Sequence, residues 1–153
     1  MKHLFLILLL IPVASYFSGA QELVEKDDTY LLNDKPYTGK WTTYYENGSV
    51  KMVTEIKDGK KNGQTKIFFE DGQINEIRAY KQNKMDGKWV MYNNHGIKIS
   101  VARYKDGLKH GKWTIWNEYG NLLYELEYKN GEKTGTWKNY NEKGELISER
   151  KYE

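Results

Sequence analysis

The sequence predicts an all-β fold: an elongated, open antiparallel meander of about five 24-residue hairpin repeats in a single-layer sheet. Two observations carry this prediction. The chain is rich in aromatic residues for its mean hydropathy of −0.85, and broad rings favour strands. Glycines also recur every 24 residues in two columns, which indicates a repeat array: Gly39, Gly63, Gly87, Gly111 and Gly135, then Gly48, Gly72, Gly96, Gly120 and Gly144.

A third column holds the turn that links one hairpin to the next. It contains Asn as well as Gly, and these residues best tolerate a left-handed backbone, so we expect positive φ throughout the column. The segments between turns have strand length and composition, as in "KWTTYY" and "NLLYELEYK". Each repeat therefore reads as a β-hairpin. The column comprises Gly59, Asn83, Gly107 and Gly131.

The N-terminal residues 1–20 resemble a secretory signal peptide. Lys2 precedes an apolar run from Leu4 to Val13, and small residues at 18–20 suit cleavage. An uncleaved anchor is the alternative, although the run is shorter than a transmembrane helix needs. The chain has no cysteine, which excludes lipoprotein processing and disulfides. We therefore expect an exported protein that is periplasmic, in the cell envelope or secreted.

Residues 21–29 are interpreted as an N-terminal linker and residues 30–153 as the repeat domain. A half repeat, "TYLLNDKPYTG", comes first and places Leu32 where later units carry Ile56 or tyrosine, which gives about eleven strands in one meander. The final strand is heavily charged, as suits an exposed sheet edge. The full repeats lie near residues 39–62, 63–86, 87–110, 111–134 and 135–153.

No catalytic, cofactor or metal site is expected. His110 lies in a turn where other repeats carry Asn62, Asp86 or Thr134, so it is interpreted as a turn residue. No histidines have ligand spacing, and no calcium-loop or phosphate-loop pattern occurs. Acids such as Glu46 recur by repeat position, which is typical of structural residues. After residue 20 the chain has 23 basic and 21 acidic residues. It is nearly neutral, and no nucleic-acid partner is expected.

Two aromatic columns are the candidate binding residues. They either pack within the sheet or form an exposed surface that stacks on sugars or anchors a protein, and both can hold, one on each face. The first column is Trp41, Trp89, Trp113 and Trp137, with Thr65 in the second repeat, and the other is Tyr44, Phe68, Tyr92, Trp116 and Tyr140.

A basic edge is the second candidate surface. The turns that link hairpins carry a total charge of +7, and the turns inside hairpins carry −5. In a meander these two sets lie on opposite long edges. The lysines either keep the turns soluble or attract an anionic surface, through four residues read as being in register: Lys61, Lys84, Lys109 and Lys133.

The stretch "YKDGLKHGKW" followed by "YG" resembles the MORN repeat variant family of bacterial antitoxin-like repeat proteins, and the resemblance covers residues 30–153. It implies an elongated sheet of successive hairpins that makes protein–protein contacts and lipid contacts. We therefore expect an exported, non-enzymatic binding or scaffold module for protein partners. The alternatives are an antitoxin-like partner that neutralises a secreted or envelope toxin, or a binder of anionic lipid or glycan surfaces.

Overall fold

The computed structural model describes residues 23–153. The signal peptide expected at residues 1–20 lies outside the described residues, as does Gln21, which would follow the cleavage site. Every regular element from residue 23 onward is a strand, so the all-β prediction is confirmed. This part of the chain accordingly has no helix long and apolar enough to cross a bilayer.

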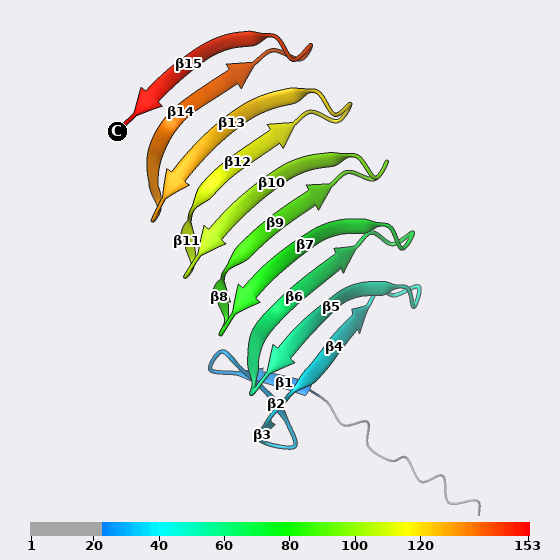
Figure 1. Ribbon diagram of the computed structural model, residues 1–153. Helices are drawn as coiled ribbons and strands as arrows, with labels where there is room; N and C mark the ends of the chain where they lie inside the picture. Colours follow the sequence, from blue (N-terminus) through cyan, green and yellow to red (C-terminus); the bar gives the residue numbers. More distant parts are fainter. Residues whose placement is uncertain (1–22) are drawn as a thin grey trace, which may run out of the picture.

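Ten strands follow one another in a single antiparallel sheet, and each pairs with the strands before and after it in this series. Figure 1 shows one twisted layer, with the turns inside hairpins along one long edge and the linking turns along the other. The ten are β4 (Gly39–Tyr44), β5 (Val50–Lys57), β6 (Lys60–Phe68), β7 (Ile74–Lys81), β9 (Gly87–Tyr92), β10 (Lys98–Lys105), β12 (Gly111–Trp116), β13 (Leu122–Lys129), β14 (Glu132–Tyr140) and β15 (Leu146–Tyr152).

Two short strands complete this sheet on the linking edge. Strand β8 (Lys84–Met85) pairs with β7, and β11 (Leu108–Lys109) pairs with β10. At the ends of the first and fourth repeats the corresponding residues, 60–61 and 132–133, are continuous with the longer strands β6 and β14, which pass through a β-bulge. The sheet is therefore an open meander of hairpins, as the sequence predicts.

The linking turns confirm the expected backbone. Asp58 and Gly59 have φ of 51° and 75°, and Gln82 and Asn83 have 49° and 67°. Two consecutive positive φ values are the mark of the type I′ turn, whose twist matches that of the flanking strands. Asn83 thus adopts the left-handed conformation that its place in the glycine column indicated.

Neighbouring linking turns are also joined to one another. The Gly107 N–H donates to the Met85 carbonyl at 2.8 Å, and the corresponding bonds recur in the other repeats. Side chains add a second contact: Asn62 Oδ1 accepts from the Gln82 N–H at 3.3 Å, and His110 Nδ1 accepts from the Asn130 N–H at 3.4 Å. His110 is therefore a turn residue, as the sequence analysis inferred, because it performs the role that Asn62 performs elsewhere.

The turns inside hairpins are closed by side-chain acceptors. Asn93 Oδ1 accepts from the backbone N–H groups of His95 and Ile97, and Asn117 and Asn141 make the same pair of bonds in the next two repeats. Each such turn also contains a glycine at positive φ. Local hydrogen bonding of this kind holds the turn without help from a distant segment.

The N-terminal half repeat does not form as predicted. Strands β1 (Leu23–Lys26), β2 (Thr29–Leu32) and β3 (Lys35–Pro36) make a separate three-stranded sheet. Tight turns at 27–28 and 33–34, with all four residues at positive φ, fold this segment on itself before it can extend along β4. The segment interpreted as a linker over residues 21–29 therefore contains strand β1 and part of β2.

The small sheet closes the N-terminal end of the meander. Tyr30, and not Leu32, packs on Trp41, with ring centroids 5.3 Å apart and 2% of Tyr30 exposed. The Tyr30 N–H donates to the Gly59 carbonyl at 2.8 Å, and Asn83 Nδ2 donates to the Asp28 carbonyl at 2.5 Å. The aromatic packing of the repeats is thus continued by a residue that the 24-residue period does not point to.

Gly59 and Gly107 provide a matched test of this contact, since they share a repeat position and have φ of 75° and 89°. A Cβ at Gly59 would press on Thr29, Pro36 and the Tyr30 carbonyl, whereas a Cβ at Gly107 meets nothing within 4 Å. We expect Gly107→Ala to cost about 1 kcal/mol for the left-handed backbone. Gly59→Ala should cost about 2–4 kcal/mol, because crowding adds to that strain. Equal losses in urea unfolding would show that the small sheet does not pack on this turn.

Candidate functional site

A ladder of alternating tyrosine and tryptophan rings crosses one face of the sheet, called here the ladder face. The rings of Trp89, Tyr104, Trp113, Tyr128, Trp137 and Tyr152 follow one another with centroids 4.9–5.2 Å apart and planes tilted by 49–59°. Tyr80 extends this run at 5.9 Å from Trp89. The predicted tryptophan column is therefore half of the ladder. The tyrosines that complete it recur at another repeat position, and only the strand pairing places them between the tryptophans.

Hydrogen bonds fix the indoles in the ladder. The Nε1–H groups of Trp89, Trp113 and Trp137 donate to the carbonyls of the residues ten positions earlier, at 3.3, 3.0 and 2.9 Å. Each of these tryptophans also has a tyrosine on both sides. Because its ring faces are covered within the sheet, it offers little more than ring edges to a sugar or another ligand.

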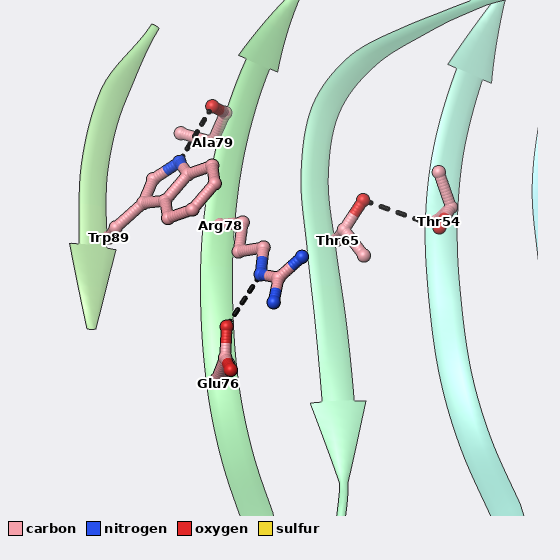
Figure 2. A network of polar contacts seen from close by, with 6 residues as sticks. All are labelled: Thr54, Thr65, Glu76, Arg78, Ala79 and Trp89. Atoms are coloured by element: carbon pink, nitrogen blue, oxygen red, sulfur yellow. Dashed lines mark hydrogen bonds and ion pairs between the residues drawn. The ribbon is translucent and has the colours of Figure 1, made fainter. Parts of the chain in front are cut away.

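The ladder is interrupted where the second repeat carries Thr65. Figure 2 shows the replacement: Thr65 donates from Oγ1 to Thr54 Oγ1 at 3.3 Å, and Arg78 on the next strand bonds to Glu76 at 2.5 Å. Thr54 and Thr65 are buried. The Arg78 guanidinium carbon lies 5.0 Å from the centroid of Trp89. Polar groups that hydrogen-bond to one another therefore occupy the position of the missing indole.

Lysine ammonium groups lie over the ladder rings. Lys61 Nζ is 5.6 Å from the ring centroids of both Tyr30 and Tyr80, so it bridges the interrupted part of the ladder. Burial is the largest single influence on the pKa of Lys61 and lowers it, but the hydrogen bond to Tyr30 and the nearby charges of Tyr30, Glu25 and Tyr80 together raise it, and the net direction is upward. Burial is also the main cause that raises the pKa of Tyr30. This lysine is part of the packing of the fold.

The basic column contains one error of register. Lys109 lies 4.8–4.9 Å from the rings of Trp113 and Tyr128, and Lys133 lies 4.5–5.3 Å from those of Trp137 and Tyr152. Lys109 pairs with Tyr104, whereas Lys84 pairs with Lys81. Met85, which pairs with Tyr80, holds the position equivalent to Lys109. The reading of Lys84 as in register was wrong because a shift of one residue turns a strand side chain to the other face.

The second aromatic column does not form a ladder. Its members lie toward the turns inside the hairpins, and none stacks on another within residues 23–153. Tyr140 donates to Glu125 at 2.7 Å, and this hydrogen bond raises the pKa of Tyr140. Phe68 lines a hollow with Lys40, Glu55 and Lys66 on the face opposite the ladder. The remaining members are Tyr44, which is 61% exposed, Tyr92 and Trp116.

A row of side chains, half of them apolar or tyrosine, runs beside the ladder on the same face, and sequence reasoning missed it. Strand pairing links one residue from each of the ten strands. Each lies two positions after the tryptophan position or four positions before the tyrosine position of the ladder. We call this set the outer row: Thr43, Met52, Ile67, Glu76, Met91, Ser100, Ile115, Tyr124, Asn139 and Ser148. The signal was the residue two positions after the tryptophan position, which is apolar in the middle three repeats, although the second of the five repeats carries Thr65 in place of tryptophan.

The outer row is accessible because no second layer covers the sheet. Met91 is 39% exposed and Tyr124 is 40% exposed. Toward the C-terminal end the row borders an open groove of about 540 Å³ over β12–β15, with Ile115, Leu126 and Trp137 among its lining residues. Exposed apolar side chains gathered on one face are a feature of interaction surfaces. In residues 23–153 no group of three or more His, Asp or Glu side chains is arranged to hold a metal ion.

Comparison with known proteins agrees with this architecture. The family model described as MORN repeat variant matches residues 37–58, 61–82, 109–130 and 133–153, which together exceed half of the chain. Residues 83–108 lie between these matches but form the same strands and turns as the other repeats. A search of the curated proteins finds no match to the sequence. Four matched repeats in a sheet of successive hairpins lead to one conclusion: the chain belongs to the MORN repeat variant family.

Proposed function

We propose that the protein is an exported, non-enzymatic binding or scaffold module that engages a protein partner through the ladder face. Membership of the MORN repeat variant family supports a repeat binding module. The observation that carries the choice of face is the outer row, a continuous register across ten strands. Half of its residues are large apolar or tyrosine side chains, and Met91 and Tyr124 among them are exposed. Nine steps between strands at about 4.8 Å make this row roughly 43 Å long.

The chemistry of the face favours a protein over a glycan. Sugars stack on free aromatic ring faces, but Trp89, Trp113 and Trp137 have tyrosines on both sides. Protein interfaces instead bury methionine, aliphatic and tyrosine side chains at their centre, surrounded by a polar rim. Met91 and Tyr124 supply such a centre. The exposed residues Lys109 and Lys133 near the linking edge supply a polar rim.

The proposal is non-enzymatic because the polar side chains serve the turns and the ladder. His110 accepts a backbone N–H, and Asn93 and Asn117 close their turns in the same way. Catalysis requires a nucleophile or acid–base pair held together at one place. An antitoxin-like role is one form that a binding module can take, and the identity of the captured partner would decide it.

Site-specific photo-cross-linking tests the choice of face. A benzoylphenylalanine at Met91 or Tyr124 in the full-length protein, in the cells that make it, should form a covalent adduct with the partner protein. The same group at Thr136, which is exposed on the opposite face between β13 and β15, should not. Adducts at Thr136 alone would move the site to the other face, and adducts at none of the three positions would contradict a protein partner.

Lys61 and Lys84 test the packing role of lysine, because the Lys61 ammonium lies over two rings and the Lys84 side chain is on the other face of the sheet. Lys61→Ala should lower the free energy of unfolding by about 1–2 kcal/mol, because it removes a cation from between two rings. Lys84→Ala should change it by less than about 0.5 kcal/mol, because an exposed side chain away from the ladder is replaced. Urea unfolding of the two variants measures both values. A larger loss for Lys84→Ala would contradict the stacking of Lys61.

Export rests on residues 1–20, whose apolar run and small residues suit a signal peptide. If the protein is exported and cleaved, mass spectrometry of the protein from its native cells should find Gln21 as the first residue. An intact N-terminus in the soluble cytosolic fraction would contradict export. This outcome would leave the binding face unchanged, so the two parts of the proposal can fail separately.

A further inference from the structure

Arg78 and Arg150 occupy the same repeat position, three repeats apart, but their surroundings differ. Arg78 is paired with Glu76 at 2.5 Å. The position equivalent to Glu76 is Ser148, which has no charge. Within residues 23–153 Arg78–Glu76 is the one ion pair with N–O contact within 4.0 Å. Arg150 is therefore exposed on the ladder face without the carboxylate that neutralises its counterpart.

The charged neighbours of Arg150 strengthen this difference. Its guanidinium carbon lies 5.1 Å from the centroid of Tyr152, and Lys133 Nζ lies 5.3 Å from the same ring. Glu149 lies opposite Lys138, and alternation along the strand turns both side chains toward the other face. Two cations therefore flank Tyr152 at the ladder end of the groove over β12–β15. An anion at this place would meet both charges.

The groove is mostly apolar, and Ile115, Tyr124, Leu126 and Trp137 form the apolar part of its lining. Lys138, Asn139, Ser148 and Glu149 also border it, and Arg150 and Tyr152 bound it on β15. Its volume of about 540 Å³ is enough for one or two large side chains. The groove lies on an open sheet, so a free small molecule would keep one side in water. A segment of a protein brings the remaining cover with it, because the partner's own surface closes over the groove.

Resting on the proposed function, we propose that this groove docks a partner protein segment that carries a large apolar side chain beside an Asp or Glu. The apolar side chain lies against Leu126 and Tyr124, and the carboxylate binds the Arg150 guanidinium. Arg–carboxylate pairs are short and directional, so Arg150 sets the position of the segment along the ladder. Lys133 adds attraction for the same carboxylate. The site is specific to the last repeat, because only there does an unpaired arginine border the groove.

A displayed library of random peptides, selected on the full-length protein, tests this chemistry. Selected peptides should carry Asp or Glu within two residues of Leu, Phe or Trp. Arg150→Gln should weaken their binding about tenfold or more, as expected for the loss of a charged hydrogen bond. Ser148→Glu should weaken it similarly, since the new carboxylate would pair with Arg150 as Glu76 pairs with Arg78. Lys151→Gln is the matched control: it removes the same charge from the opposite face of β15 and should leave binding unchanged.

Each other outcome overturns the proposal. Selected peptides that lack an acidic residue would exclude an anion site at Arg150. So would peptides that bind the Arg150→Gln and Ser148→Glu variants as tightly as they bind the unchanged protein. Binding of decanoate below its micelle concentration that depends on Arg150, with no peptide selected, would make the occupant a free amphipathic anion. If the protein self-associates and both variants abolish this self-association, the occupant of the groove would be a second copy of the chain. Cross-linking from Met91 that survives Arg150→Gln would leave the proposed function standing while this inference fails.

Discussion

A single-layer sheet has no second layer against which its strands can bury apolar side chains, so each strand must find its packing partners on the strands beside it. The alternating rings of the ladder meet this constraint. Tyr104 fills the space between Trp89 and Trp113, and Tyr128 fills the next one. Each ring pair contributes about 0.5–1.5 kcal/mol beyond the area it buries. Because every repeat contacts only its neighbours, these contributions add along the array.

Other features of the molecule follow from the ladder. The indole N–H groups reach neighbouring carbonyls, so the rings also hold the register of the strands. Where Thr65 replaces tryptophan, the chain supplies Lys61 and the Arg78–Glu76 pair in its place. At the N-terminal end Tyr30 adds a ring from outside the repeats. Covering the rings on both sides also removes them as stacking platforms, and this leaves the outer row as the accessible apolar surface.

Repeated and unrepeated residues have different roles in such an array. Side chains that recur at a turn position, such as Asn93 and Asn117, serve the geometry that every hairpin shares. Recognition of one partner needs positions where the repeats differ. The outer row changes from Met91 to Ile115 to Asn139, and the arginine position is neutralised in one repeat and free in another. We therefore infer that the binding properties of the protein reside in its departures from the repeat.

The period of 24, the hairpins and the turns at positive φ could be predicted from the sequence, because each depends on residues close together in the chain. Asn83 at φ 67° is an example, since its backbone preference is local. The separate sheet of residues 23–36, the stacking of Lys61 and the outer row could not be predicted, because they depend on which residues lie opposite each other on different strands. Lys84 and Met85 show how narrow that dependence is. Neighbours in a strand point to opposite faces, so a register error of one residue moves a side chain from the ladder to the other side of the sheet.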